Sequence, residues 1–291
     1  MTLVLMEQPD ALRLSKTGGH KYGHGHAVVV TGGAGRTGAA RLAARGALRI
    51  GAGLVTLAVP GSAQMEVAGA ITALMLRRAD DGGGLDALLR DDRLNAVCLG
   101  PGLGLDRARD LVPVVLGSTG LTARPTVLDA DALTAFGDEP DAFFDALHDS
   151  CVLTPHGGEF ARLFPAIAAD LAVTPDHGPA YSRVDAVRAA AALAGCVVLL
   201  KGPDTVIAAP DGRCVIHSAA YDRAAPWLAT AGSGDVLAGL ITGLLARGLP
   251  PIEAAGSGAW LHVECARAFG PGLIAEDLPE MIPSVLRTLG S

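Results

Sequence analysis

The sequence predicts an α/β protein with a mostly parallel central sheet, helices on both faces of the sheet and an antiparallel edge. Two observations support this fold class. Short apolar runs alternate with longer amphipathic runs along the 291 residues, and such alternation is typical of parallel strands joined by crossover helices. The turn Pro210-Asp211-Gly212 joins two apolar runs directly, which indicates a β-hairpin and therefore antiparallel pairing.

The apolar runs give the expected strands in chain order, because runs of this length rich in Val, Leu, Ile and Ala are typical of buried strands. We expect strands at Ala27–Thr31, Leu54–Val59, Ile71–Leu76, Ala96–Leu99, Thr126–Asp129, Cys151–Leu153, Val197–Leu200, Thr205–Ala208 and Cys214–His217. The longer runs space their apolar residues at helical intervals. We expect helices at Thr37–Ile50, Arg107–Leu116, Pro140–Leu147, Ser182–Ala194, Gly234–Arg247, Ile252–Phe269 and Leu278–Leu289.

The remaining stretches do not divide the chain. Gly82-Gly83-Gly84 and residues Pro165–Pro179 are interpreted as loops, because Gly and Pro interrupt regular structure. We see no long linker and no internal repeat, so we expect one domain over residues 1–291, with residues 1–25 as an N-terminal extension. The histidines between His20 and His26 lack the acidic or cysteine partners of a metal site. We interpret that segment as a loop near the active-site edge.

Composition limits the possible partners and compartments. Half of the residues are hydrophobic, aromatic residues make up 4%, and the net charge is −7 without a long Lys/Arg run. These values argue against nucleic acid as a partner. The longest apolar stretch, Ala189–Leu200, is too short to cross a membrane, and the N-terminus lacks a cleavable leader pattern. We expect a cytoplasmic protein in which four of the five cysteines are small core residues, since they lie within or beside apolar runs. The five are Cys98, Cys151, Cys196, Cys214 and Cys265.

Six polar or glycine-rich turns follow predicted strands or open a helix. Because ligands of open α/β sheets bind beyond the carboxyl ends of the strands, we expect these turns to form one site. They are Gly32–Gly38, Gly100–Gly104, Asp129–Asp131, Thr154–Glu159, Lys201–Asp204 and Gly232–Asp235.

The last of these turns carries the strongest chemical signal. The backbone N–H groups of Ala231, Gly232, Ser233 and Gly234 can form an anion hole for a phosphate at the start of a helix. Asp235 then stands beside that anion and can take a proton from a hydroxyl. This pairing suits phosphoryl transfer to a non-protein hydroxyl. Asp235 can also be read as an acid that only stabilises the helix start.

Three common motifs are rejected. Residues Gly33–Gly38 match the G-x-G-x-x-G dinucleotide fingerprint, but the next strand, Leu54–Val59, lacks the acidic residue that would hold a ribose. The same turn lacks the G-K-[ST] of a P-loop. Ser233 lies in Ala-Gly-Ser-Gly-Asp, which is not the G-x-S-x-G of a serine hydrolase.

Six ordered motifs together resemble one family. They are GAARLAARGALRIGAGLVTLAVP at 38–60, LGPGLG at 99–104, LDADAL at 128–133, LTPHGGEF at 153–160, LKGPDTVIAAPDG at 200–212 and ATAGSGDVLAG at 229–239. The combination is similar to the ADP/ATP-dependent NAD(P)H-hydrate dehydratases of the ribokinase-like superfamily, over nearly the whole chain. The resemblance implies a three-layer ribokinase-like fold.

The resemblance also implies a repair reaction. The family uses ATP or ADP, with Mg²⁺, to phosphorylate the ring hydroxyl of NADH hydrate or NADPH hydrate and to expel phosphate, which restores NAD(P)H. It implies a homo-oligomer, and it implies that a separate chain supplies the epimerase often fused to such enzymes. Two alternatives stay open: a vitamin-precursor or sugar kinase of the same superfamily, and a nucleotide-binding module without catalysis.

The resemblance assigns roles by position. Asp235 is the expected catalytic base, and the turn before it is the anion hole. Lys201, Gly202, Pro203, Asp204 and Thr205, with Gly234, are expected to bind the AMP part of the nucleotide. Ala39, Gly102, Gly104 and His156, with Asp235, are expected to bind the hydrated dinucleotide.

Some roles remain open at this point. Glu159 is either a group that organises Mg²⁺, through water, or an ordinary first-turn acid. Asp129 and Asp131 could each bind a sugar hydroxyl, face a cation's water shell or cap the next helix. Two departures from the family stand out: Gly157 replaces a frequent proline, and the loop Ser218–Pro226 contains no asparagine.

Overall fold

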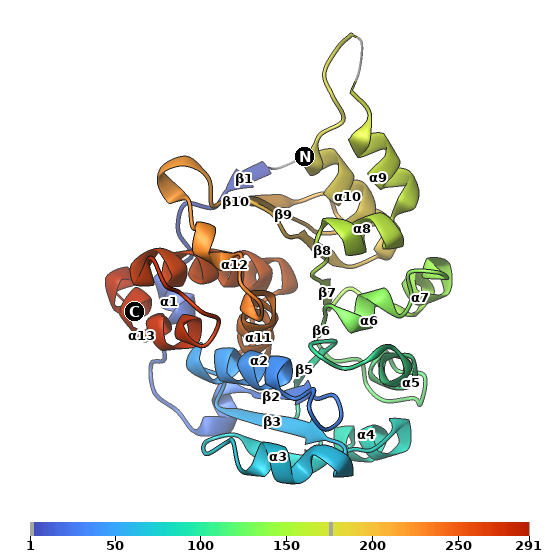
Figure 1. The fold of residues 1–291 in the computed structure, drawn as a ribbon, viewed down its shortest axis with the longest axis vertical. Helices are drawn as coiled ribbons and strands as arrows, with labels where there is room; N and C mark the ends of the chain where they lie inside the picture. The colour runs from blue at the N-terminus through green and yellow to red at the C-terminus, as the bar shows by residue number, and fades with distance from the viewer. Residues whose placement is uncertain (1–2, 175–176, 291) are drawn as a thin grey trace.

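The computed structural model describes residues 3–174 and 177–290 and shows an α/β fold built on a ten-stranded sheet (Figure 1). The strand order is β1-β10-β9-β8-β7-β6-β5-β2-β3-β4. The strands are β1 Leu3–Leu5, β2 His26–Val30, β3 Leu54–Val59, β4 Met75–Arg78, β5 Ala96–Leu99, β6 Thr126–Leu128, β7 Cys151–Leu153, β8 Val197–Leu200, β9 Asp204–Ala208 and β10 Cys214–Ser218.

The sheet is parallel except at β9. β9 runs antiparallel to both β8 and β10. Its Ile207 lies opposite Leu199 of β8 on one side and opposite Val215 of β10 on the other. The predicted sheet and the predicted hairpin are therefore confirmed. β1, which lies within the expected N-terminal extension, pairs in parallel with β10 and forms the outermost strand on that side.

Helices cover both faces of the sheet, as predicted (Figure 1). Strand β2 shows why, because its successive side chains enter opposite cores: Ala27 and Val29 belong to one buried cluster, whereas Val28 and Val30 belong to the other. The longer helices are α2 Gly38–Arg49, α4 Gly82–Leu89, α5 Leu105–Val115, α9 Pro165–Ala172, α10 Arg183–Ala194, α11 Ser233–Ala246, α12 Pro251–Phe269 and α13 Asp277–Leu289; the shorter ones are α1 Ala11–Leu14, α3 Gln64–Ala68, α6 Asp131–Thr134, α7 Pro140–Ala146 and α8 Gly157–Leu163.

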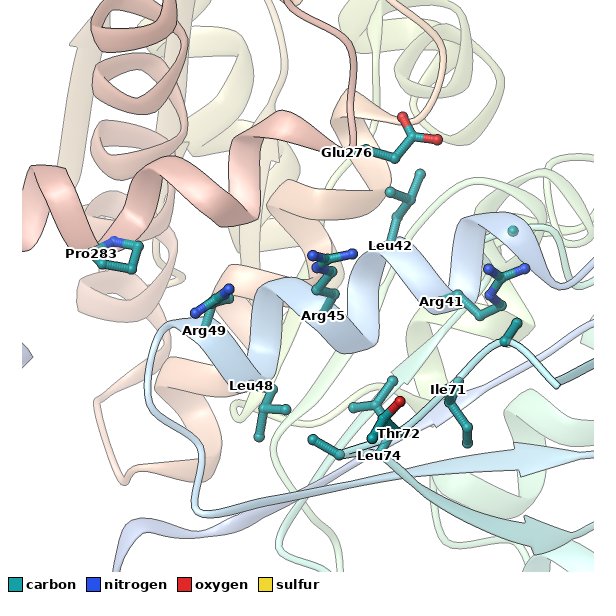
Figure 2. Close-up of a pocket in the computed structure, with 13 residues that line it drawn as sticks. Arg41, Leu42, Arg45, Leu48, Arg49, Ile71, Thr72, Leu74, Glu276 and Pro283 are labelled. Carbon is teal, nitrogen blue, oxygen red and sulfur yellow. The ribbon is translucent and has the colours of Figure 1, made fainter. Parts of the chain in front are cut away.

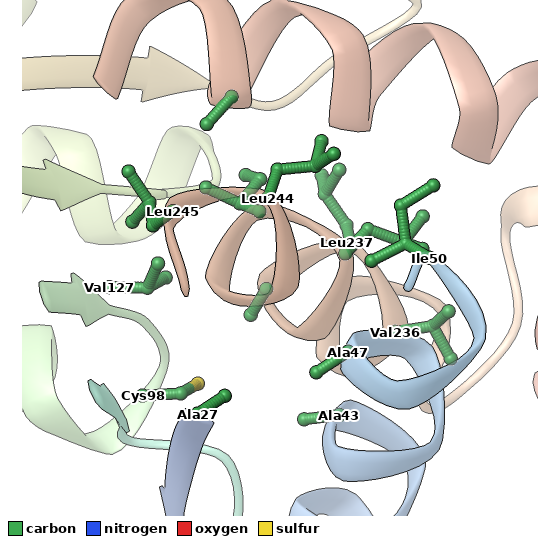
Figure 3. Close-up of a cluster of buried hydrophobic side chains, with 14 of the residues drawn as sticks. Ala27, Ala43, Ala47, Ile50, Cys98, Val127, Val236, Leu237, Leu244 and Leu245 are labelled. Atoms are coloured by element: carbon green, nitrogen blue, oxygen red, sulfur yellow. The ribbon is translucent and has the colours of Figure 1, made fainter. Parts of the chain in front are cut away.

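Helices α2 and α11 pack in close contact, which positions the start of α11. A Cβ atom on Gly239 would lie 2.0 Å from the carbonyl oxygen of Ala43, so only glycine permits this approach. Figure 3 shows Ala43 and Ala47 of α2 beside Val236 of α11 within the buried cluster.

Three sequence expectations were wrong in detail. The strand expected at Ile71–Leu76 lies at Met75–Arg78, because β3 pairs from Thr56 onward with residues starting at Met75. The glycine run at 82–84 begins helix α4, since the Asp81 side chain accepts a hydrogen bond from the N–H of Gly84. Residues Pro165–Ala172 form helix α9, with proline in its favoured first position; residues 175–176 of that expected loop lie outside the described part.

The His20–His26 segment does not lie near the active-site edge, which corrects that expectation. His26 is the first residue of β2, whereas the glycine-rich turns follow its last residue, Val30. Gly25 packs against the carbonyl of Ala246, the last residue of α11. Asp235 is in the first turn of that 14-residue helix, about 16 Å from Ala246 along the helix axis.

The core holds all five cysteines as buried free thiols, one more than the four expected. None of the helices in residues 3–174 and 177–290 combines the length and the apolar character that crossing a bilayer requires.

Candidate active site

The turns after five neighbouring strands meet at the carboxyl edge of the sheet, as the sequence predicted. Strands β8, β7, β6, β5 and β2 are adjacent, so the turns that follow them are adjacent as well. Backbone contacts join them directly. The N–H of Lys201 donates to the carbonyl of Pro155. A Cβ on Gly100 would lie 1.6 Å from the Asp129 carbonyl, and one on Gly32 would lie 2.1 Å from that of Gly102.

The Gly-rich turn (residues 231–234) enters helix α11 through a left-handed residue. Gly232 has φ +88°, and a Cβ there would lie 2.6 Å from Cδ1 of Leu42, so the position requires glycine. The Ser233 hydroxyl donates a 2.8 Å hydrogen bond to the carbonyl of Leu228 and so anchors the turn. Among the hydrogen bonds of the described residues, the N–H groups of Gly234 and Asp235 have no protein acceptor, as expected for a first helical turn. They are available to an anion.

Asp235 is a half-buried carboxylate whose environment favours the protonated form. Burial, followed by the negative charge of Asp129, raises the pKa of Asp235 to about 6, although the positive charge of Lys201 acts in the opposite direction. A carboxylate with a pKa of about 6 is mostly ionised at neutral pH and is a stronger base than an exposed aspartate. Its properties therefore suit a general base.

Lys201 and Asp129 form an ion pair at the ends of β8 and β6. The Nζ of Lys201 lies 2.8 Å from Oδ1 of Asp129, and the aspartate side chain is 2% exposed. Burial is the largest single influence and lowers the pKa of Lys201, but the charge and hydrogen bond of Asp129, together with the charges of Glu159 and Asp235, raise the pKa overall. A Cβ on Gly234 would lie 3.5 Å from the same Nζ. The ammonium group is thus charged and adjoins the Gly-rich turn. The Asp129 side chain does not cap helix α6 but pairs with Lys201, and its two ligand-binding roles stay predictions.

A cavity of about 510 Å³ extends from Lys201 between the β8–β9 turn and helix α12. Four residues of the predicted nucleotide-binding segment Lys201–Thr205 line it: Lys201, Gly202, Pro203 and Thr205. Gly234 lines it as well, whereas Asp204 is exposed at the first position of β9. The asparagine-free loop contributes Ala219, Ala224, Ala225 and Pro226, so its side of the cavity is largely apolar.

His156 and Glu159 form a reciprocal cap at the start of α8. The N–H of Gly158 donates to Nδ1 of His156 at 2.9 Å, and the N–H of His156 donates to Oε2 of Glu159 at 2.8 Å. The Glu159 side chain is 6% exposed, whereas that of His156 is 58% exposed. The structure therefore supports the first-turn interpretation of Glu159. His156 keeps an accessible ring at the edge of the site.

The small residues expected on the dinucleotide side lie together. A Cβ on Gly102, which has φ +63°, would lie 3.3 Å from Cβ of Ala39. Gly104 also has a positive φ, and its N–H donates to Oδ2 of Asp131 at 2.7 Å. Asp131 thus holds the Gly100–Gly104 turn in place.

His262 of helix α12 was not among the site residues predicted from the sequence. Its Nε2 lies 2.8 Å from the carbonyl oxygen of Ser233, and it lines the same cavity as Lys201. Burial lowers the pKa of His262 to about 4, so the ring is neutral at pH 7 and its Nε2–H donates to the carbonyl. A single histidine in an apolar helix carries no sequence signal for a partner 29 residues away.

Comparisons with known proteins agree on one family. Residues 27–283 match the model of the NAD(P)H-hydrate dehydratase family. The ADP-dependent (S)-NAD(P)H-hydrate dehydratase of Neisseria meningitidis serogroup B is 37% identical, over 87% of this chain and 80% of that protein. The ADP/ATP-dependent NAD(P)H-hydrate dehydratase of Bacillus subtilis, co-crystallised with ATP/Mg²⁺, is 26% identical with a TM-score of 0.74, and the match covers 98% and 99% of the two chains.

A ribokinase-like superfamily protein of Enterococcus faecalis has the same fold, with a TM-score of 0.77 and 20% identity over 99% of this chain and 96% of that one. The predicted ribokinase-like fold is thereby confirmed. The chain spans about half the length of the bifunctional NAD(P)H-hydrate repair enzymes that it matches.

Proposed function

We propose a function from one premise: this chain belongs to the NAD(P)H-hydrate dehydratase family. We infer that it uses ATP or ADP to dehydrate NADH hydrate or NADPH hydrate. One observation carries the proposal. Asp235, with a pKa of about 6, follows the Gly-rich turn and interacts electrostatically with Lys201, which lines a nucleotide-sized cavity.

Each residue of the site has a separate role in the proposed reaction. Asp235 takes the proton from the ring hydroxyl while that oxygen attacks the terminal phosphoryl group. The N–H groups of Ala231, Gly232 and Gly234 and the ammonium of Lys201 stabilise charge on the transferring phosphoryl oxygens. The Ser233 N–H, the fourth of the predicted anion-hole donors, donates to the carbonyl of Thr230 instead. The C–O bond of the resulting phosphate ester then breaks with electron donation from the neighbouring ring nitrogen. Loss of a proton from the adjacent carbon restores the double bond, so the products are NAD(P)H, phosphate and the shortened nucleotide.

The two substrates occupy different sides of the Gly-rich turn in this proposal. The nucleotide lies in the 510 Å³ cavity, with its AMP part against Gly202, Pro203, Asp204 and Thr205. The nicotinamide end of the hydrate lies over Ala39, Gly102 and Gly104, beside His156. Gly102 and Gly104 have positive φ, which favours glycine, so neither position adds a side chain to this surface.

Mg²⁺ fits this site as a partner of the nucleotide rather than as a resident ion. Within the described residues, no three His, Cys, Asp or Glu side chains are arranged to hold a metal ion. Mg²⁺ is commonly held by phosphate oxygens and water with few protein ligands. Glu159 already accepts a hydrogen bond from the His156 N–H, so we assign it contact with Mg²⁺ through water only. When bound, Mg²⁺ neutralises charge on the phosphates.

The test is recovery of the near-ultraviolet absorbance of dihydronicotinamide when the protein is incubated with fresh NADPH hydrate, Mg²⁺ and either ATP or ADP. We expect recovery, with phosphate released in equal amount. Accumulation of a stable phosphorylated product would assign the chain to the kinases instead. Binding of nucleotide without turnover of either hydrate would support a module without catalysis.

Three further points belong to the same proposal. We place the protein in the cytoplasm, since its five free thiols suit a reducing compartment. An epimerase would interconvert the two forms of the hydrate. Exposed Leu3, Val4 and Leu5 on the outermost strand support a homo-oligomer, which light scattering of the purified chain tests directly.

A further inference from the structure

A second cavity opens beside the Gly-rich turn, on the side away from the nucleotide. This cavity, the α2 pocket, has a volume of about 700 Å³ and lies along helix α2 (Figure 2). Leu42 lines it, and a Cβ on Gly232 would lie 2.6 Å from Cδ1 of that leucine. Gly38, next to Ala39, lines the pocket one helical turn before Leu42. The α2 pocket is therefore adjacent to the place proposed for the hydrate's nicotinamide ring.

Three arginines lie along one side of α2 in this pocket, as Figure 2 shows. Arg41, Arg45 and Arg49 follow one another at four-residue intervals, which places them on the same helix face. Arg45 and Arg49 both contact Glu280 of α13, at 2.7 and 2.5 Å. Glu276 also lines the pocket. Three positive charges thus face two negative ones, and Glu280 holds two of the guanidinium groups in place.

The remaining lining is apolar. Leu48, Ile71 and Leu74 lie on the opposite side of the pocket from Glu276 (Figure 2). An apolar surface next to guanidinium groups suits a ligand with an aromatic ring and a phosphate, because guanidinium forms paired hydrogen bonds to phosphate oxygens and stacks on rings. From Gly38 to Arg49, α2 extends about 16 Å. A dinucleotide whose nicotinamide end is at Asp235 can therefore lie along this helix with its adenosine end.

We propose that the α2 pocket binds the adenosine end of the substrate dinucleotide and that Arg41 and Arg45 contact its 2′-phosphate, so that this protein favours NADPH hydrate over NADH hydrate. The inference rests on the proposed function, which supplies the dinucleotide. The two coenzymes differ only in that phosphate, and a neutral 2′-hydroxyl offers no charge for the arginines to bind.

The test measures binding and turnover separately. Calorimetry of the full chain with 2′-phospho-ADP-ribose and with ADP-ribose should give roughly tenfold tighter binding of the phosphorylated probe, since hydrogen bonds to charged groups are strong. Arg41→Gln combined with Arg45→Gln should reduce that preference to less than about twofold and raise KM for NADPH hydrate roughly tenfold with little change in kcat. Arg213→Gln, on the exposed β9–β10 turn, is the matched control and should change neither value.

Several results would overturn the inference. One is equal affinity of the unmodified protein for the two probes. Another is an equal loss of affinity for both probes in the double variant. Without a change in oligomeric mass, that loss would show that the pocket does not distinguish the 2′-phosphate, and with such a change it would identify the pocket as a subunit interface. If the double variant fails to fold, Arg41→Gln alone carries the test, because Arg41 is not part of the Glu280 pairs. Selective binding of the phosphorylated probe without any dehydration would refute the proposed function and leave the pocket assigned.

Discussion

The ammonium group of Lys201 lies 2.8 Å from the carboxylate of Asp129, and the two groups act in opposite directions on the same base. Asp129 raises the pKa of Asp235, and Lys201 lowers it. Burial makes the largest contribution to the raised pKa of Asp235, and the ion pair adjusts that pKa while it keeps a charged ammonium group beside the Gly-rich turn.

The pH dependence of the reaction should report this arrangement. We expect kcat/KM to fall below a pH of about 6, because protonated Asp235 cannot accept the hydroxyl proton. Asp129→Asn should move that acid limb to lower pH, since the charge that raises the pKa of Asp235 is removed. Asp211→Asn, which alters an exposed ion pair with Arg213, should leave the limb in place. An acid limb that does not move in Asp129→Asn would contradict the assignment.

Asp235→Asn should abolish activity and, at high pH, increase stability. We expect turnover to disappear while nucleotide affinity is retained, because the variant keeps the turn and Lys201. The pKa of Asp235 rises from 3.8 to about 6 on folding, so ionised Asp235 destabilises the folded state. This cost is absent below pH 3.8, grows between the two pKa values and is complete above pH 6.

The variant lacks that cost and should be more stable than the unmodified protein at pH 8, by up to about 3 kcal/mol. The difference should vanish near pH 4. Urea denaturation at the two pH values measures it, and a variant less stable at pH 8 would show that the carboxylate is favourably solvated.

Gly232→Ala should disrupt the Gly-rich turn. Gly232 has φ +88°, and the added methyl group would lie 2.6 Å from Leu42 and 2.9 Å from Cβ of Ala275. We expect a loss of about 1–3 kcal/mol of stability and a strong reduction in kcat. Gly23→Ala is the matched control, since a methyl group there meets no atom within 4 Å and φ is not positive. Retention of full kcat in Gly232→Ala would remove the turn from the mechanism.

His262 should act as a positioning residue for the Gly-rich turn. His262→Phe removes the 2.8 Å hydrogen-bond donor to the Ser233 carbonyl, so the turn should shift and KM for the nucleotide should rise. His262→Gln can still donate a hydrogen bond and should restore part of the affinity. If Phe and Gln give the same KM, the hydrogen bond does not position the turn.

Gly157→Pro should stabilise the protein by about 0.5–1 kcal/mol. Gly157 is the first residue of α8, where proline is favoured, and the preceding His156 has the extended ψ of 173° that proline requires. Activity should be unchanged, because the capping contacts of His156 involve the N–H groups of Gly158 and Glu159. A drop in the melting temperature would show that the N–H of Gly157 has a role.

Much of the fold and part of the site could be predicted from local patterns. The boundaries of α2 and α11 agree with the expected helices to within one or two residues, because helical periodicity is a local property. The strand at β4 was misplaced, since apolar Ile71 and Leu74 resemble strand residues but line the α2 pocket. Three consecutive glycines concealed α4, whose start depends on capping by Asp81.

The sequence predicted which residues carry chemistry, and that their turns gather at one edge, because the carboxyl ends of parallel strands face the same way. Which of these residues meet depends on the tertiary structure. Lys201 and Asp129 are 72 residues apart, and Ser233 meets His262 across two helices. Strand order and the packing of α11 between α2 and α12 produce these contacts, and no local propensity encodes them.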